Sequence, residues 1–123
     1  MNSTEFSIEN VTNPITKAPF GSKYAGKFAI KRPSIKDKLA ISLQDAAEMS
    51  AYGISNPYQM LSEGIKLLSY IVKFVEVTAA TPVPEWFDLT KMYEDDDEEA
   101  ILAVWNEIQA FLDTFRVKQP ATA

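Results

Sequence analysis

The sequence predicts a mainly α-helical protein, with a three-helix core preceded by a short N-terminal β-ribbon or an extended arm. Apolar residues recur at three- and four-residue steps in three long stretches, which is the period of an amphipathic helix. Prolines and glycines interrupt the chain between these stretches. The length of 123 residues, of which 46% are hydrophobic, fits one domain. We expect an extended, partly flexible arm at 1–24, a helical domain at 25–117 and a disordered tail at 118–123.

The first segment holds Pro14 and Pro19 and many short polar residues, so it cannot form a long helix. Alternation of Phe6 and Ile8 with polar neighbours allows one short strand. A second strand is predicted at 27–31, where Phe28 and Ile30 share one face. The two strands could pair as a ribbon, which is stable only if it packs against something else.

The first helix is predicted to begin at Pro33 and Ser34, because proline suits a first turn and Ser34 can cap it with Asp37 three residues on. It should run to about Tyr52, before Gly53. Its expected core stripe consists of Ile35, Leu39, Leu43 and Ala46, with Ile41 and Met49 at the flank.

The second helix is predicted to begin at Asn56 and Pro57 and to end before Pro82. Its apolar residues occupy a wide arc, which places it at the centre of the domain. They form two neighbouring stripes, Leu61, Ile65, Leu68, Val72 and Val75, and Leu67, Ile71 and Phe74.

The third helix is predicted to begin within the acidic run 94–99, where carboxylates meet the positive end of the helix dipole, and to continue to about Phe115. Its apolar face comprises Ile101, Val104, Trp105, Ile108, Leu112 and Phe115.

Composition argues against an enzyme. The sequence has no cysteine and no histidine, which removes thiol chemistry, Cys-based metal sites and the commonest general base. No glycine-rich phosphate loop is present. A calcium loop counted from Asp95 fails, because Ala100 falls where glycine is required and Asn106 where a bidentate glutamate is required. We therefore predict no catalytic residue, no cofactor and no metal site.

Charge is distributed unevenly along the chain. Seven basic residues and one acid lie between Lys17 and Lys38, whereas ten acids and one lysine lie between Glu85 and Asp113. The two regions either face each other or solvent within the monomer, or complement another subunit or a charged partner. A basic segment without interleaved aromatic residues, on a chain with net charge −5, argues against nucleic-acid binding.

Two further features bear on partners and location. Trp86 and Phe87 follow two prolines, so they form either a lid over the helical core or an anchor for a partner. The N-terminus has no basic start and apolar run of a signal peptide, and the apolar stretch 65–77 is too short to cross a bilayer. We expect an intracellular protein without membrane contact.

Three motifs then occur in a recognisable order across about residues 25–117. They are Arg32-Pro33-Ser34-Ile35-Lys36-Asp37-Lys38, the loop Pro84-Glu85-Trp86-Phe87 and the closing pair Phe115-Arg116. In order and spacing the chain resembles the small tail assembly chaperones of long-tailed bacteriophages. The resemblance implies a non-enzymatic helper, absent from the finished virion, that binds the tape-measure protein in the host cytoplasm and helps to recruit tail-tube protein.

The resemblance also favours a homo-oligomer that offers helical grooves to amphipathic client segments. Charge and expected exposure, rather than family contact sites, suggest Trp86 and Phe87 as partner contacts, with Lys31 and Arg32 pairing acids of a neighbour or client. Two alternatives are a structural phage subunit, such as a head-tail or tail completion adaptor, and an acidic inhibitor that mimics DNA. The acids are bunched at one predicted helix start, which weakens the mimic hypothesis.

Overall fold

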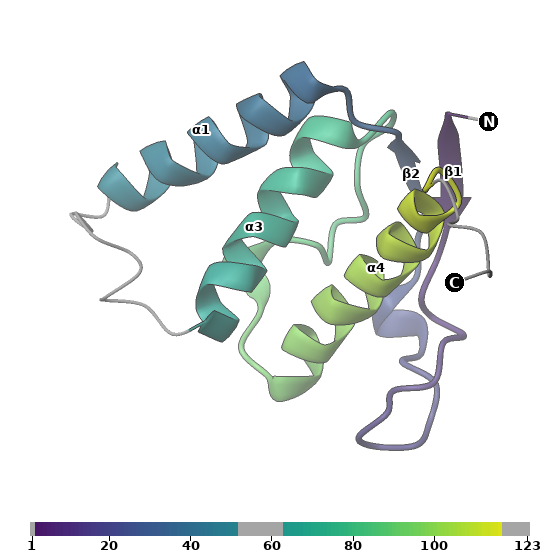
Figure 1. The fold of residues 1–123 in the computed structure, drawn as a ribbon. Coiled ribbons are helices and arrows are strands. Elements are labelled where there is room, and N and C mark those ends of the chain that lie inside the picture. The colour runs from purple at the N-terminus through teal and green to yellow at the C-terminus, as the bar shows by residue number, and fades with distance from the viewer. Residues whose placement is uncertain (1, 52–62, 117–123) are drawn as a thin grey trace, which may run out of the picture.

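The computed structural model describes residues 2–51 and 63–116, and within them it confirms the mainly α-helical class with a short N-terminal ribbon. The predicted helix start at Asn56 and Pro57, residue Leu61 of the core stripe and the C-terminal tail lie outside the described residues, as does the side chain of Met49. The described elements, shown in Figure 1, are the strands β1 (Ser3–Phe6) and β2 (Phe28–Lys31), the helices α1 (Ile35–Ala51), α3 (Glu63–Thr78) and α4 (Asp95–Asp113), and short 3-10 turns at Ser22–Tyr24 and Leu89–Lys91.

A short N-terminal ribbon is confirmed, but its first strand is Ser3–Phe6, so Phe6 lies at its end and Ile8 lies outside it. β1 and β2 pair antiparallel, with Phe6 opposite Phe28, and the two rings stack with their centroids 5.3 Å apart. β2 is buried at Phe28, Ala29 and Ile30 because the end of α3 covers it, and the Ala80 N–H donates to the Ala29 carbonyl at 2.8 Å. This packing supplies the support that an isolated two-stranded ribbon lacks.

The segment before the helices contributes directly to the core. Ile8 is fully buried, Tyr24 is 3% exposed and Asn13 is 2% exposed. The Asn13 side-chain oxygen accepts the Ile15 N–H at 2.8 Å, which folds the loop back on itself. The division into an arm and a helical domain stays a prediction, but the described part of 1–24 packs with the rest of the chain.

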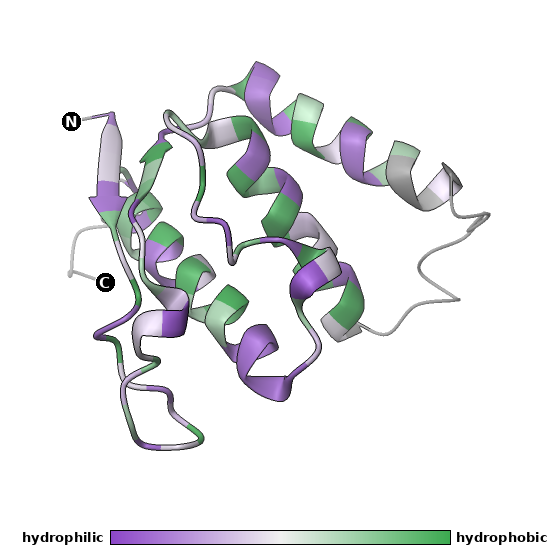
Figure 2. Cartoon of the chain, turned by 180° about the vertical axis from the view of Figure 1, so that it is seen from behind, coloured by the Kyte–Doolittle hydropathy of each residue, from purple (hydrophilic) through white to green (hydrophobic). Residues whose placement is uncertain are grey.

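Helix α3 lies between α1 and α4 (Figure 1), as the wide apolar arc predicted. Ile71, Phe74 and Val75 are buried, and α4 covers them with Ile101, Val104 and Ile108. Apolar residues also occur along α1 (Figure 2). The first turns of α3 are less covered, since Ile65 is 47% exposed and Leu67 is 39% exposed.

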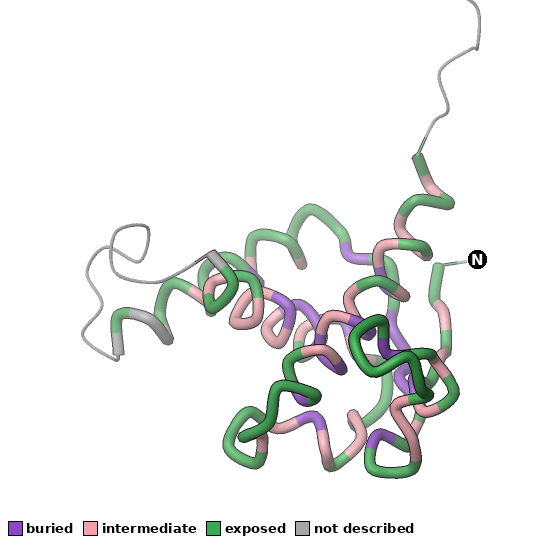
Figure 3. The backbone as a smooth tube through the Cα atoms, turned by 90° about the horizontal axis from the view of Figure 1, so that it is seen from below, coloured by how far each residue is buried: buried purple, intermediate pink, exposed green. Residues whose placement is uncertain are grey.

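The predicted core stripe of α1 is wrong. Ile35, Leu39 and Leu43 are 79%, 59% and 61% exposed, Ala46 is exposed, and most described positions of the helix face solvent (Figure 3). The residue expected at the flank, Ile41, is fully buried. Helical spacing shows which residues share a face, but not which face meets a neighbour. Here the face is selected by Ile41 together with Asp45, whose carboxylate accepts a hydrogen bond from the Ser69 hydroxyl of α3.

The predicted pairing of Ser34 with Asp37 at the start of α1 is confirmed, but Pro33 precedes the helix, which begins at Ile35, and does not belong to its first turn. The Asp37 carboxylate accepts the Ser34 N–H at 2.9 Å, and the Ser34 hydroxyl oxygen accepts the Asp37 N–H at 3.1 Å. The two residues thus satisfy reciprocal backbone donors at the helix start. These hydrogen bonds also hold the pKa of Asp37 below its usual value, the bond from the Ser34 backbone being the main cause.

Substitutions on the two sides of α1 should differ in their effect on the free energy of unfolding. Ile41→Ala should lower the free energy of unfolding by about 2 to 4 kcal/mol, because it leaves a cavity between α1 and α3. Leu39→Ala, on the exposed side, should change it by less than about 0.5 kcal/mol. Urea unfolding followed by circular dichroism measures both, and equal losses would contradict the orientation of α1.

Candidate interaction surface

The most prominent exposed apolar feature of the described residues is the outer face of α1, which we define as Ile35, Leu39 and Leu43. A spacing of four residues puts the three side chains in a row along one side of the helix. Scattered exposed apolar residues are ordinary, whereas a contiguous row on one element is typical of a binding surface. The opposite side of the helix carries the contact with α3 through Ile41 and Asp45.

Charge on and near this face is asymmetric. Asp37 is engaged by Ser34 and by the Lys31 ammonium, 3.9 Å from its carboxylate, and Asp45 is engaged by Ser69 of α3. Lys36 and Lys38 at the start of the helix are exposed. The outer face therefore combines apolar side chains with a positive end.

Lys31 and Arg32, suggested as partner contacts, lie at the end of β2 and just after it. Lys31 pairs with Asp37 of the same chain, and the Arg32 guanidinium carbon lies 4.1 Å from the centre of the Phe115 ring. Both residues are exposed. Their contact with a partner stays a prediction, but each also has a contact within the monomer.

Trp86 and Phe87 belong to an aromatic cluster at the other end of β2. The Phe87 ring lies 5.3 Å from Phe28 and the residue is 8% exposed. Trp86 is partly buried, with its ring 5.0 Å from Tyr24, and its indole nitrogen is buried with no hydrogen-bond partner among the described residues. This arrangement fits the lid interpretation, and anchoring of a partner by these two residues stays a prediction.

A glycine lets this aromatic loop approach the chain after the 3-10 turn. Gly26 has φ of 127°, and a Cβ built on it would lie 2.7 Å from the Pro84 Cγ. A side chain at this position would meet both backbone strain and a clash. The structure therefore places Trp86 and Phe87 at one end of β2 and Lys31 and Arg32 at the other, so the four candidates do not form one site.

A polar contact that the sequence pattern did not indicate joins the basic and acidic segments. The Tyr24 hydroxyl donates to the Asp97 carboxylate at 2.7 Å, and the Lys23 ammonium lies 3.0 Å from the same oxygen. The other carboxylate oxygen accepts the N–H groups of Tyr93 and Glu94, both at 3.0 Å. Tyr24 and Asp97 are 73 residues apart, so no local spacing could have indicated the pair.

This environment shifts two pKa values in opposite directions. Burial alone would raise the pKa of Asp97, but hydrogen bonds from Tyr24, Lys23 and the backbone lower it to about 2. Burial, and then the hydrogen bond to Asp97, raise the pKa of Tyr24 to about 12. Asp97 therefore stays ionised and Tyr24 protonated over the ordinary pH range.

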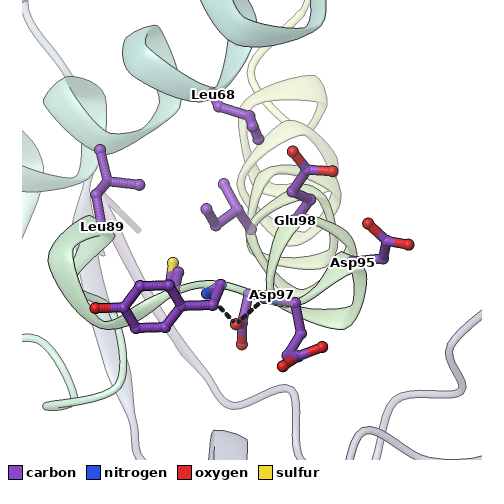
Figure 4. A pocket seen from close by; sticks show the side chains of 9 residues that line it. Leu68, Leu89, Asp95, Asp97 and Glu98 are labelled. Carbon is purple, nitrogen blue, oxygen red and sulfur yellow. Dashed lines mark hydrogen bonds between the residues drawn. The ribbon is translucent and has the colours of Figure 1, made fainter.

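Beside Asp97, the start of α4 borders a hollow of about 180 Å³, shown in Figure 4. Leu68 and Leu89 line one side, and Asp95 and Glu98 lie at the rim. The rim acids Glu94, Asp95 and Glu98 are exposed. Across residues 2–51 and 63–116 no group of three or more carboxylates is arranged to hold a metal ion. The acidic rim is a charged surface at the opposite end of α4 from Phe115.

Comparison with protein-family models, with curated proteins and with solved structures finds no match. Within the described part of the chain, no helix is both long enough and apolar enough to span a membrane. The exposed residues of the protein therefore supply the evidence for its class.

Asp97→Asn tests the buried carboxylate. Because folding lowers the pKa of Asp97 from 3.8 to about 2, ionised Asp97 contributes about 2 kcal/mol to stability above pH 3.8. That contribution is lost as the pH falls through 2. We expect the variant to be less stable at pH 6 and to lose less stability than the wild type between pH 5 and about 2.

Urea unfolding of both proteins across this range measures the effect. The matched control is Asp95→Asn, an exposed acid at the same helix start with no hydrogen bond of this kind among the described residues. If the Asp97 and Asp95 variants show the same pH dependence, the stabilising role of the buried carboxylate is wrong.

Proposed function

We propose that this protein is a tail assembly chaperone of a long-tailed bacteriophage, which binds the tape-measure protein and helps to recruit tail-tube protein without catalysing a reaction. The observation that carries the proposal is the outer face of α1, a row of exposed apolar side chains on a helix whose other side packs against α3. A surface of this kind suits an amphipathic client helix. The order of motifs in residues 25–117, which resembles that of tail assembly chaperones, favours the tape-measure protein as the partner.

In this proposal the client contributes an amphipathic segment whose apolar residues cover Ile35, Leu39 and Leu43. Each copy would bind one short stretch of a long client, and a homo-oligomer would present several such faces together. Binding would keep client segments apart until tail-tube protein replaces the chaperone. The action would take place in the host cytoplasm, without nucleic acid, membrane or cofactor.

The two alternatives have less support. A head-tail or tail completion adaptor would use the same apolar face but would stay in the particle, so proteomics of mature virions would distinguish it. A DNA mimic needs carboxylates spaced like phosphates along a duplex. Most of the exposed acids of α4, namely Asp95, Asp96 and Glu98, lie together at its start, which suits a capped helix better.

The test is co-expression with the tape-measure protein of the same genome, followed by size-exclusion chromatography with light scattering. We expect a client that is insoluble alone to co-elute with many copies of this protein. Replacing Leu39 and Leu43 together by serine should reduce the co-eluting client roughly tenfold or more, because central apolar residues dominate such contacts.

Ile15→Ser is the matched control, since Ile15 is 71% exposed in a loop outside the helices. It should leave client binding and stability unchanged. Trp86→Ala and Lys31→Ala test the contacts suggested by the sequence. An insoluble client with the wild-type protein unchanged in size would refute the chaperone proposal, whereas equal binding by the Leu39/Leu43 double variant and the wild type would refute only the role of α1.

A further inference from the structure

A second hollow lies where the start of α1 meets the end of α4. We call it the basic hollow. It has a volume of about 250 Å³, and its lining residues are Arg32, Pro33, Lys38, Gln109, Leu112, Phe115 and Arg116. Asp95 and Glu98 border the other hollow at the opposite end of α4, so the helix separates a basic site from an acidic one (Figure 1).

Three cations border the basic hollow, and two of them have no carboxylate partner among the described residues. Arg116 pairs with Asp113, its Nε lying 3.2 Å from the carboxylate. No described carboxylate lies within ion-pair distance of the side chains of Arg32 or Lys38. The nearby acid Asp37 is engaged by Lys31 and Ser34. The hollow therefore offers positive charge at Arg32 and Lys38 that no carboxylate of residues 2–51 and 63–116 neutralises.

Arg32 is held in place before any ligand arrives. Its guanidinium lies over the Phe115 ring at 4.1 Å, its backbone N–H donates to the Asn2 carbonyl, and the following Pro33 is buried. Stacking on a ring uses the face of the guanidinium and leaves its N–H edge free for hydrogen bonds. A fixed guanidinium loses little conformational entropy when it binds a planar carboxylate in a bidentate manner.

The remaining lining favours a peptide over a free ion. Leu112 and Phe115 are partly buried and provide an apolar wall beside the cations. Lys38 lies one helical turn after Ile35, the first residue of the outer face of α1. A segment with both apolar and acidic side chains can therefore contact the outer face and the hollow together.

From these contacts we propose that the basic hollow binds glutamate or aspartate side chains of an acidic amphipathic peptide segment, with Arg32 and Lys38 as the cations that pair with them. The proposal goes beyond the chaperone function by assigning a charge to the ligand. It rests on that function only for the origin of the segment, which would then be an acidic stretch of the tape-measure protein.

Nucleic acid fits the hollow less well. The Phe115 face is occupied by Arg32, so it is not free to stack on a base. The protein carries a net charge of −5, and the acidic start of α4 would repel a long polyanion. A short acidic segment avoids that repulsion, because it need not extend along α4.

The experiment titrates the full-length protein with a short fluorescein-labelled peptide of leucine and glutamate in an amphipathic pattern, and follows fluorescence anisotropy. The comparison peptide has glutamine in place of every glutamate. We expect the glutamate peptide to bind at least about tenfold more tightly than the glutamine peptide, and to weaken as salt rises from roughly 50 to 500 mM.

Variants locate the site. Arg32→Gln and Lys38→Gln should each weaken the glutamate peptide by about threefold to tenfold. Lys91→Gln is the matched control, because it removes one exposed charge in the 3-10 turn before α4. Arg32→Gln also removes packing on Phe115, so its thermal unfolding is checked. Lys38→Gln keeps the test decisive if Arg32→Gln unfolds, since the Lys38 side chain has no partner among the described residues.

Each other outcome has a defined meaning. Equal binding of the glutamate and glutamine peptides, or equal loss with Lys38→Gln and Lys91→Gln, overturns the proposal. Tighter binding of a short DNA duplex, lost in the Lys38 variant, overturns it in favour of a nucleic-acid site. If the glutamate peptide binds at the hollow but the tape-measure protein does not co-elute, the hollow is supported and the chaperone function fails. If the client co-elutes but the peptide does not bind, the chaperone function is supported and the proposed binding at the hollow fails.

Discussion

The contact between Tyr24 and Asp97 holds together parts of the chain that are distant in sequence. Asp97 stands in the first turn of α4, and its carboxylate accepts hydrogen bonds from the Tyr24 hydroxyl and from two backbone N–H groups. The same oxygens thus complete the helix start and tie it to the segment that leads into β2. Around this polar contact, the Tyr24 ring packs on Trp86 and Phe20, so the aromatic loop is fixed by the same residue. An ionised carboxylate is tolerated at 3% exposure because every one of these donors points to it.

Once β2, α3 and α4 are packed, the main helix contact of α1 is with α3. α1 uses Ile41 and the Asp45 to Ser69 hydrogen bond for that contact, and three apolar side chains of the same size as Ile41 stay outside. Burial of such side chains stabilises a protein, so leaving them exposed gives up stability that a different helix orientation would have gained. A surface of this kind is expected in a protein whose work is to cover apolar segments of another chain, and this is why the outer face of α1 carries the proposed function.

Acidic and basic side chains are separated on the surface of the protein. The Lys23 to Asp97 ion pair shows that the basic and acidic segments meet within the monomer. Away from that contact they separate, with acids around the start of α4 and Arg32, Lys38 and Arg116 around its end. Opposite charges at the two ends of α4 would favour one orientation of a charged partner, because charged groups set register more than affinity.

Local rules were sufficient to predict the helical stretches, the start signals of α1 and α4 and the presence of a ribbon. Reciprocal hydrogen bonds of Ser34 and Asp37, the alternation of Phe28 and Ile30, and the central place of α3 are all as predicted. Packing against α3 determined which face of α1 is buried, because periodicity groups residues on a face without showing what lies opposite. Tertiary packing likewise joined Tyr24 to Asp97 and Arg32 to Phe115, contacts between residues that no spacing along the chain relates.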